Sequence, residues 1–175
     1  MHKDVKEILY TEEELLKRAK EIGRQITEDY KGEDIVLVGV LRGAVIFLAD
    51  IMRGIELDCI VDFISVRSYE GTVSGKLEII NGLSVDIENK NVIIVEDILD
   101  TGKTLYHVKE EMMKKKPKSL KICALLDKKT EKYADIKADY TGFYIKDEFV
   151  VGYGLDYSQK YRNLPYIGVI KEEAI

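Results

Sequence analysis

Tryptophan is absent from the 175-residue chain, and proline, cysteine and histidine occur only twice each. Cys59 and Cys123 lack the C-x-x-C spacing of a zinc or redox site, so they are predicted to be buried core thiols outside any disulfide framework. His2 and His107 are too few for a histidine-rich metal site. No apolar run approaches the roughly 20 residues that span a bilayer, and no signal-like apolar run opens the sequence. We therefore expect a cytoplasmic protein with no membrane partner.

Charge also limits the function classes. Acidic and basic residues are interspersed, and the formal net charge is −5, which provides no positive field for nucleic acid. The one basic run, at residues 114–116, falls in the last turn of an expected helix, where cations complement the helix dipole. With 46% hydrophobic residues, the chain can bury one core, and a single domain over residues 1–175 is expected.

Apolar runs of strand length alternate with helical patterns along the chain. Thr11 and Glu14 form a capping-box pattern before a helix that is expected to end near residue 31. Strands are expected at 35–40, 59–66, 92–95 and 119–126, and further helices at 45–52 and 105–116. This alternation predicts an α/β fold with a mostly parallel central sheet flanked by helices.

The strongest chemical signal is the stretch VIIVEDILDTGKT at residues 92–104. Its first four residues are β-branched without polar alternation, which is typical of a parallel strand covered on both faces. Glu96 and Asp97 follow where such a strand reaches the ligand-binding edge of an α/β sheet. Small residues then lead into a helix whose first amides and dipole can hold an anion. The stretch predicts a phosphate site beside two carboxylates.

Two other interpretations of this stretch are possible. An ordinary strand-to-helix turn explains the small residues, because Asp, Thr and Gly are common there. It does not explain two acids at the end of an apolar strand, where desolvation is costly unless a ligand or cation compensates. A P-loop matches Gly102, Lys103 and Thr104, but that motif requires glycine where this chain has Asp97.

The stretch resembles the phosphoribosyl-diphosphate-binding motif of type I phosphoribosyltransferases. In that family the two acids, here Glu96 and Asp97, hold the ribose hydroxyls. The loop that follows binds the 5-phosphate. By this resemblance the ribose and 5-phosphate site comprises Glu96, Asp97, Asp100, Thr101, Gly102, Lys103 and Thr104. The resemblance further implies a type I phosphoribosyltransferase fold, with a small hood formed by the chain termini and a mobile lid loop.

Two further segments match the same family. A glycine between a strand and a helix often serves only close packing, but Leu41, Arg42 and Gly43 match a loop that binds the pyrophosphate end of the substrate, often through a cis peptide before the basic residue. The polar stretch at residues 67–75 could be a solvated surface loop. Ser68 and Tyr69, however, stand where purine phosphoribosyltransferases carry the base of a lid that excludes water from the reaction centre.

The last third of the chain indicates the branch of the family. A lysine at a strand end, here Lys128, usually reaches to solvent. An aromatic beside an apolar strand, here Phe149, can stack on a flat base. In order and spacing, residues 37–170 resemble hypoxanthine-guanine phosphoribosyltransferases. The resemblance implies purine contacts by Lys128, Phe149, Val150 and Asp156, and a pyrophosphate contact by Arg162. Glu148 departs from the family pattern, where lysine is frequent, which leaves the guanine preference open.

The resemblance implies transfer of a phosphoribosyl group from phosphoribosyl diphosphate to hypoxanthine or guanine, giving IMP or GMP. Asp100 would act as the base at purine N7. Mg²⁺ would be the cofactor, with Glu96, Asp97 and Asp156 as candidate ligands, and a homodimer or homotetramer is expected. Two alternatives remain: a regulator of the same fold that binds phosphoribosyl diphosphate and nucleic acid, and an enzyme that also accepts xanthine.

Overall fold

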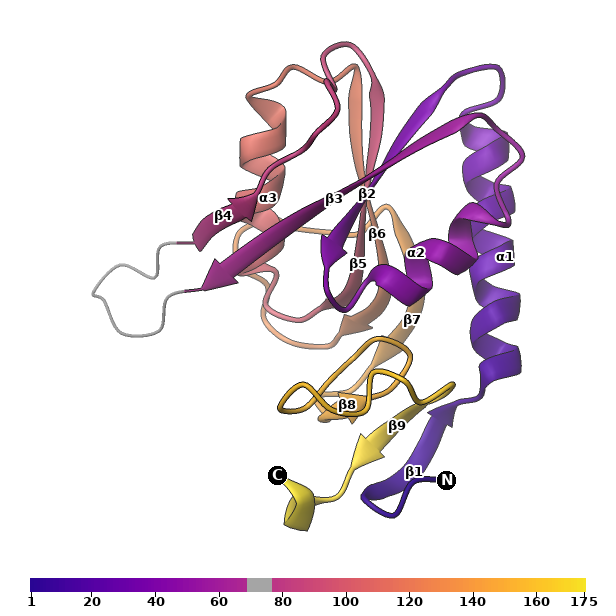
Figure 1. Cartoon of the computed structure of the whole chain (residues 1–175), viewed down its shortest axis with the longest axis vertical. Helices are drawn as coiled ribbons and strands as arrows, with labels where there is room; N and C mark the ends of the chain where they lie inside the picture. The colour runs from indigo at the N-terminus through magenta and orange to yellow at the C-terminus, as the bar shows by residue number, and fades with distance from the viewer. Residues whose placement is uncertain (69–76) are drawn as a thin grey trace.

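The strands of the computed structural model, which describes residues 1–68 and 77–175, form a large and a small sheet (Figure 1). The large sheet has the order β4-β3-β2-β5-β6-β7. All neighbouring strands in it are parallel except β3 and β4, which confirms the predicted, mostly parallel sheet. The bounds are β2 (Ile35–Leu41), β3 (Cys59–Ser68), β4 (Leu77–Asn81), β5 (Asn91–Leu99), β6 (Ser119–Lys128) and β7 (Tyr140–Ile145).

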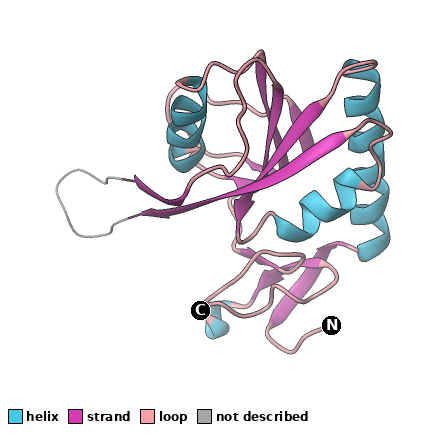
Figure 2. Cartoon of the chain, turned by 45° about the horizontal axis from the view of Figure 1, so that its top comes forward, coloured by secondary structure: helices cyan, strands magenta, loops and turns pink. Residues whose placement is uncertain are grey.

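Helices cover both faces of this sheet (Figures 1 and 2). Helices α1 (Glu12–Asp29) and α2 (Val45–Met52) lie on one face, and α3 (Lys103–Met113) lies on the other. Along β5, Ile93 and Val95 join the core under α1 and α2, whereas Val92 and Ile94 join the core under α3. All four are fully buried, and each contributes about 1.5–3 kcal/mol by leaving water. The uninterrupted apolar run therefore follows from burial on both faces.

The helix boundaries confirm some predictions and correct others. The capping box at Thr11 and Glu14 is present. Helix α1 ends at Asp29, slightly before the expected position, and α3 covers Lys103–Met113 where 105–116 was expected. The placement of lysines 114–116 in its last turn was wrong, because Lys116 precedes a proline and has a φ of 54°. A residue before proline is disfavoured in helical geometry.

The small sheet brings the two ends of the chain together. Its order is β1-β9-β8, formed by β1 (Val5–Tyr10), β8 (Val150–Val151) and β9 (Ile167–Ile170), and both pairings are antiparallel. A 3₁₀ turn, η1 (Glu172–Ala174), follows β9. Val5, Val151 and Ile170 form its buried cluster. This sheet is the hood that the resemblance implied, and Figure 2 shows it below the large sheet.

The two cysteines differ in burial. Cys123 is buried in β6, as expected, whereas Cys59 is only half-buried, so that part of the prediction was wrong. Strand β4 pairs with β3 only at its far end, Ser65–Ser68, and at Cys59 the strand forms the open edge of the sheet. Burial raises the pKa of both thiols. Both are free cysteines, as the spacing predicted.

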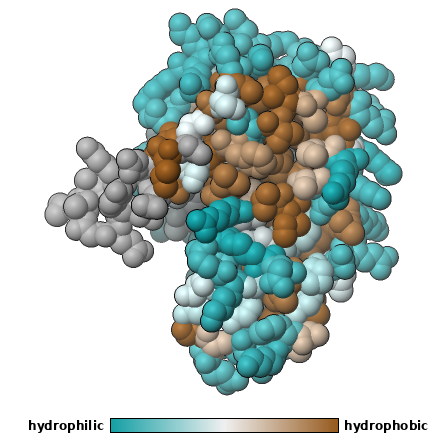
Figure 3. Space-filling model, in the orientation of Figure 1, coloured by the Kyte–Doolittle hydropathy of each residue, from teal (hydrophilic) through white to brown (hydrophobic). Residues whose placement is uncertain are grey.

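One face of the molecule carries exposed apolar side chains. Figure 3 shows them gathered where β3 and α2 lie. Val45 and Met52 come from α2, and Ile60 and Phe63 from β3. Of the helices in the described ranges, none is both long and apolar enough to cross a membrane.

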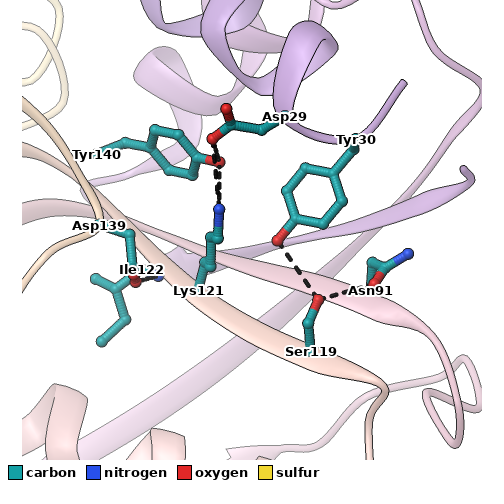
Figure 4. A network of polar contacts seen from close by, with 8 residues as sticks. All are labelled: Asp29, Tyr30, Asn91, Ser119, Lys121, Ile122, Asp139 and Tyr140. Atoms are coloured by element: carbon teal, nitrogen blue, oxygen red, sulfur yellow. Dashed lines mark hydrogen bonds and ion pairs between the residues drawn. The ribbon is translucent and has the colours of Figure 1, made fainter. Parts of the chain in front are cut away.

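A polar network ties the end of α1 to the start of three strands (Figure 4). The Tyr140 hydroxyl donates to Asp29 Oδ2 at 2.6 Å and accepts from Lys121 Nζ at 3.1 Å. Beside it, Ser119 Oγ lies 3.4 Å from the Tyr30 hydroxyl. Burial and the hydrogen bond to Asp29 raise the pKa of Tyr140. The network lies at the amino ends of the parallel strands, opposite the edge where ligands bind in such sheets.

Removal of one hydroxyl tests this network. Tyr140→Phe is expected to lower the free energy of unfolding by about 1–2 kcal/mol, because Asp29 and Lys121 lose their shared partner. Tyr144→Phe, on the same strand but 66% exposed, is the matched control and is expected to change stability by less than about 0.5 kcal/mol. Urea unfolding curves of both variants provide the comparison, and equal effects would contradict the structural role of the network.

Candidate active site

The carboxylate pair belongs to β5 itself. The apolar run predicts a strand at 92–95 with the acids emerging from it, but β5 runs on to Leu99. Pairing with β6 continues through Glu96↔Ala124 and Leu99↔Asp127, so strand geometry holds both acids. Glu96 is 9% exposed. The Asp97 amide donates to Glu96 Oε1 at 3.3 Å, and the Ile98 amide donates to Asp97 Oδ1 at 2.8 Å.

The surroundings of the two acids disfavour their ionised forms. Burial, and then the charge of Asp97, raise the pKa of Glu96 well above its usual range. Burial also raises the pKa of Asp97, and Arg162 opposes this effect only by longer-range attraction. Within the described ranges, neither carboxylate has a lysine, arginine or histidine nitrogen within ion-pair distance. A bound cation or hydroxyl donors of a ligand would stabilise the ionised pair.

Two glycines let three segments meet at Asp97. A Cβ atom on Gly43 would lie 1.5 Å from Asp97 Oδ2, so the carboxylate packs directly on the glycine backbone. A Cβ atom on Gly154 would lie 2.1 Å from the carbonyl oxygen of Gly43. The Leu41–Arg42 peptide bond before this glycine is cis, as the resemblance implied. The turn after β2, the end of β5 and the turn after β8 thus converge.

Arg42 and Arg162 meet through the side chain of Gln159. Arg42 Nη1 donates to Gln159 Oε1 at 2.9 Å, and Arg162 Nη2 lies 3.5 Å from the same oxygen. Arg162 also pairs with Asp156 at 2.7 Å and donates to the Gly154 carbonyl at 2.7 Å. Two positive charges therefore lie together, although they are 120 residues apart in the chain.

The turn from β5 into α3, residues 100–104, is termed the phosphate turn below. Gly102 has a φ of 76°, and α3 begins at Lys103 without a side-chain cap. Its first amides therefore lack a capping acceptor, which is the arrangement that binds anions at helix starts. The Tyr133 amide donates to the Thr101 carbonyl at 2.7 Å. A Cβ atom on Gly102 would lie 2.4 Å from Ile136, so glycine is required for both φ and packing.

Asp100 and Lys128 project from the ends of neighbouring strands. Asp100 Oδ1 accepts from Thr130 Oγ1 at 3.1 Å, and Lys128 Nζ lies 3.8 Å from Asp100 Oδ2. Lys128 also pairs with Asp147 at 2.8 Å, and its side chain is only 12% exposed. The half-exposed Asp100 carboxylate can exchange a proton with a ligand, while Lys128 can donate to a carbonyl group.

A cavity of about 230 Å³ lies against Asp97, Asp100 and Lys128. The Phe149 ring at its rim is 45% exposed, which leaves a flat apolar surface free to stack on a ligand. Six of the residues that the sequence suggested line the cavity, together with Ile98, Glu148 and Leu155. The lining residues are Asp97, Ile98, Asp100, Lys128, Glu148, Phe149, Val150, Leu155 and Asp156.

Some expected features are not brought together. Among the described residues, no three histidine, cysteine or acidic side chains form a metal-binding group. Asp156, expected beside Glu96 and Asp97 as a ligand, is instead held by Arg162 and by the Gln159 amide at 2.8 Å. Ser68 ends β3, and Tyr69 with the rest of the suggested lid lies outside the described residues.

Several contacts in the site were missed by sequence analysis. Thr130, Asp147 and Gln159 each hold a predicted site residue, but each belongs to a polar segment where such residues are ordinary. Lys132 binds the backbone beneath Asp100 and was missed for the same reason. Only the three-residue spacing between Asp156 and Gln159, typical of a side chain that caps a turn, was a usable signal.

Comparison with known proteins identifies the class. A model of the phosphoribosyl transferase domain matches residues 5–158, and the chain belongs to this family. Among curated proteins, it is 49% identical to hypoxanthine-guanine phosphoribosyltransferase of Staphylococcus aureus, over 99% of this chain and 98% of that protein.

Solved structures agree with this placement. A hypoxanthine phosphoribosyltransferase from Staphylococcus aureus superposes with a TM-score of 0.95 at 49% identity, covering 99% of this chain and 96% of that chain. A hypoxanthine phosphoribosyltransferase from Trypanosoma cruzi superposes with a TM-score of 0.94 at 37% identity, covering 99% and 95%. These likenesses confirm the type I phosphoribosyltransferase fold.

The contact between Gly43 and Asp97 is directly testable. Gly43→Ala is expected to lower phosphoribosyl transfer by roughly 10²-fold, because the new methyl group must displace the carboxylate or the arginine-bearing turn. Gly82→Ala is the control, since a Cβ atom there has no neighbour within 4 Å. Steady-state rates and thermal melts of both variants are compared. Normal activity of Gly43→Ala would show that the close approach is unimportant.

Proposed function

We propose that this chain transfers the 5-phosphoribosyl group of phosphoribosyl diphosphate to N9 of hypoxanthine or guanine, which releases pyrophosphate and gives IMP or GMP. The observation that carries the proposal is one sheet edge that combines a buried acid pair, an uncapped helix start and a lysine beside an exposed aromatic ring. The named relatives are purine phosphoribosyltransferases over nearly the whole chain. The reaction is therefore a step of purine salvage.

The substrate's parts match the charges of the site. The phosphate turn takes the 5-phosphate through backbone amides, and Glu96 and Asp97 accept hydrogen bonds from the ribose hydroxyls. Arg42 and Arg162 bind the pyrophosphate group, which is the negatively charged leaving group. The purine lies against Phe149 and Val150.

The reaction passes through a ribosyl centre with oxocarbenium character as pyrophosphate departs. Arg42 and Arg162 stabilise the charge that develops on the leaving group. Lys128 donates to the 6-oxo group of the purine and fixes its orientation. Asp100 accepts the N7 proton as the bond to N9 forms, and the Thr130 hydroxyl, 3.1 Å away, orients its carboxylate for that transfer.

Mg²⁺ fits this site. Glu96 and Asp97 form a desolvated acid pair without a described cationic side chain in contact. Magnesium typically binds one or two carboxylates together with substrate oxygens, and seldom a complete protein cage. Glu96 and Asp97 would hold the ion, and the bound ion would neutralise charge on the diphosphate.

The rival function, a regulator that binds phosphoribosyl diphosphate and nucleic acid, has less support. The net charge of −5 disfavours nucleic acid binding. The relatives reported above are named as enzymes. A cytoplasmic location and a homodimer or homotetramer stay predictions.

Initial-rate assays with phosphoribosyl diphosphate and four bases test the proposed function. Hypoxanthine and guanine are expected to be substrates, whereas adenine lacks the 6-oxo group that Lys128 recognises. The rate with xanthine shows whether the enzyme also accepts a purine with an oxo group at the 2-position. Absence of nucleotide with every base would reject the proposed function.

Asp100→Asn separates a proton acceptor from a structural acid. Asparagine keeps an oxygen that can accept from Thr130, so the fold is expected to survive, but it cannot take the N7 proton. Single-turnover IMP formation is expected to fall by roughly 10²–10⁴-fold, with little change in phosphoribosyl diphosphate affinity. Asp135→Asn is the control, because Asp135 is an exposed acid in the loop between β6 and β7. A stable Asp100→Asn variant with a normal rate would remove Asp100 from the mechanism.

Metal dependence is tested by chelation. EDTA is expected to abolish turnover, and added Mg²⁺ to restore it, because the acid pair and the diphosphate repel one another without a cation. Circular dichroism is expected to show the same fold and melting curve with and without EDTA. Full turnover in the presence of excess chelator would contradict the magnesium site.

A further inference from the structure

Lys132 makes an unusual set of backbone contacts behind the cavity. It lies in the segment between β6 and β7, which has no helix or strand. Its Nζ atom donates to the carbonyl oxygens of Leu99 at 2.9 Å, Asp100 at 2.7 Å and Lys128 at 2.7 Å. An ammonium group has three N–H donors, so these three carbonyls use all of them.

The charge of this ammonium group is also compensated. Asp127 Oδ1 lies 2.8 Å from Lys132 Nζ, and both side chains are largely buried, at 17% and 22% exposed. A strongly hydrated ammonium group is costly to desolvate unless hydrogen bonds and an opposite charge replace water. Here both are present, which fixes the position of Nζ. A lysine in a solvated surface loop has no such surroundings.

The three carbonyls lie where the pairing between β5 and β6 ends. The last cross-strand pair between β5 and β6 is Leu99↔Asp127. Asp100 follows Leu99 and Lys128 follows Asp127. Both residues line the cavity just beyond that pair. Lys132 joins their two carbonyls through one atom and so continues the connection between the strands past the end of the ladder. It thereby sets the separation of the two side chains, whose charged atoms lie 3.8 Å apart.

Lys132 itself is not among the residues that line the cavity. Any effect on the reaction must therefore pass through Asp100 and Lys128. Beyond Asp100, the phosphate turn has a separate hold, since the Tyr133 amide donates to the Thr101 carbonyl at 2.7 Å. The contacts of Lys132 thus concern the base-facing side of the site more than its phosphate side.

We propose that Lys132 is a positioning residue for the transfer step, holding the backbone of Asp100 and Lys128 so that the carboxylate faces purine N7 while the lysine faces the 6-oxo group. This inference rests on the proposed function, and it adds a residue whose effect is on geometry. Loss of the three hydrogen bonds lets the two strand ends separate, which moves the proton acceptor relative to the base.

A double-mutant cycle tests the proposal. Lys132→Met keeps the side-chain length and removes the donors and charge. Alone it is expected to lower kcat for IMP formation by roughly 10²-fold, with KM for phosphoribosyl diphosphate nearly unchanged because the phosphate turn keeps its own contacts. In the Asp100→Asn background the same substitution is expected to lower kcat by less than about threefold, since the acceptor it positions is already lost. Lys132→Arg, which retains a cationic donor beside Asp127, is expected to regain part of the rate.

Lys129→Met is the matched control, because this neighbouring lysine is exposed and is expected to leave kcat unchanged. Equal losses of kcat in the wild-type and Asp100→Asn backgrounds would overturn the proposal, as would a normal kcat for a folded Lys132→Met. If Lys132→Met does not fold, Asp127→Asn is used instead, because it removes the charge that holds the same ammonium group. Asp127→Asn is expected to lower kcat less than Lys132→Met would, and this loss of kcat must likewise vanish in the Asp100→Asn background. Wild-type protein without IMP formation would instead reject the proposed function itself.

Discussion

The site depends on two acids at the end of a strand buried on both faces, where burial disfavours their ionised forms. Glu96 and Asp97 continue β5 where Val92 to Val95 have already filled both cores. Burial raises the pKa values of both acids, and the charge of Asp97 raises that of Glu96 further. Such a pair is stable in its ionised form only when a ligand brings hydroxyl groups or a cation. The fold therefore holds a binding site that is electrostatically incomplete without its substrate.

The segments around this pair are arranged to supply what it lacks. Glycine at 43 allows the turn after β2 to approach Asp97 closely, and glycine at 154 allows the turn after β8 to approach Gly43. Arg42 precedes Gly43, and Arg162 donates to the Gly154 carbonyl, so both arginines lie near these turns. The phosphate turn leaves helix amides unoccupied on the other side. Cations, amides and acids thus take complementary positions along one sheet edge, the acids from β5 itself and the cations and amides from connections between elements. A parallel sheet permits this because the carboxyl ends of its strands meet at one edge.

Much of this arrangement could be predicted from local sequence. Burial on both faces of β5 follows from its β-branched run, and the capping box of α1 from the four residues at 11–14. The extension of β5 through Glu96 and Asp97 could not be predicted, because acids are unfavourable in strands unless a neighbouring strand pairs with them, as β6 does here. Lys132 and Gln159 were missed for a related reason. Their partners lie 33 and 117 residues away in the chain, and a polar residue in a loop carries no local sign of such a contact.

The hood has a consequence for how the protein becomes active during synthesis. The phosphate turn is packed by Tyr133 and Ile136, which are made well before the chain is finished. The rim of the cavity at Phe149 is different, because the Phe149 carbonyl accepts from the Ile170 amide and Val150 pairs with Val169, while β9 itself pairs with β1. Contacts of β9 with β1 and β8 form only after β9 has left the ribosome. A nascent chain can therefore assemble the phosphate turn early, but it completes the Phe149 side of the cavity later.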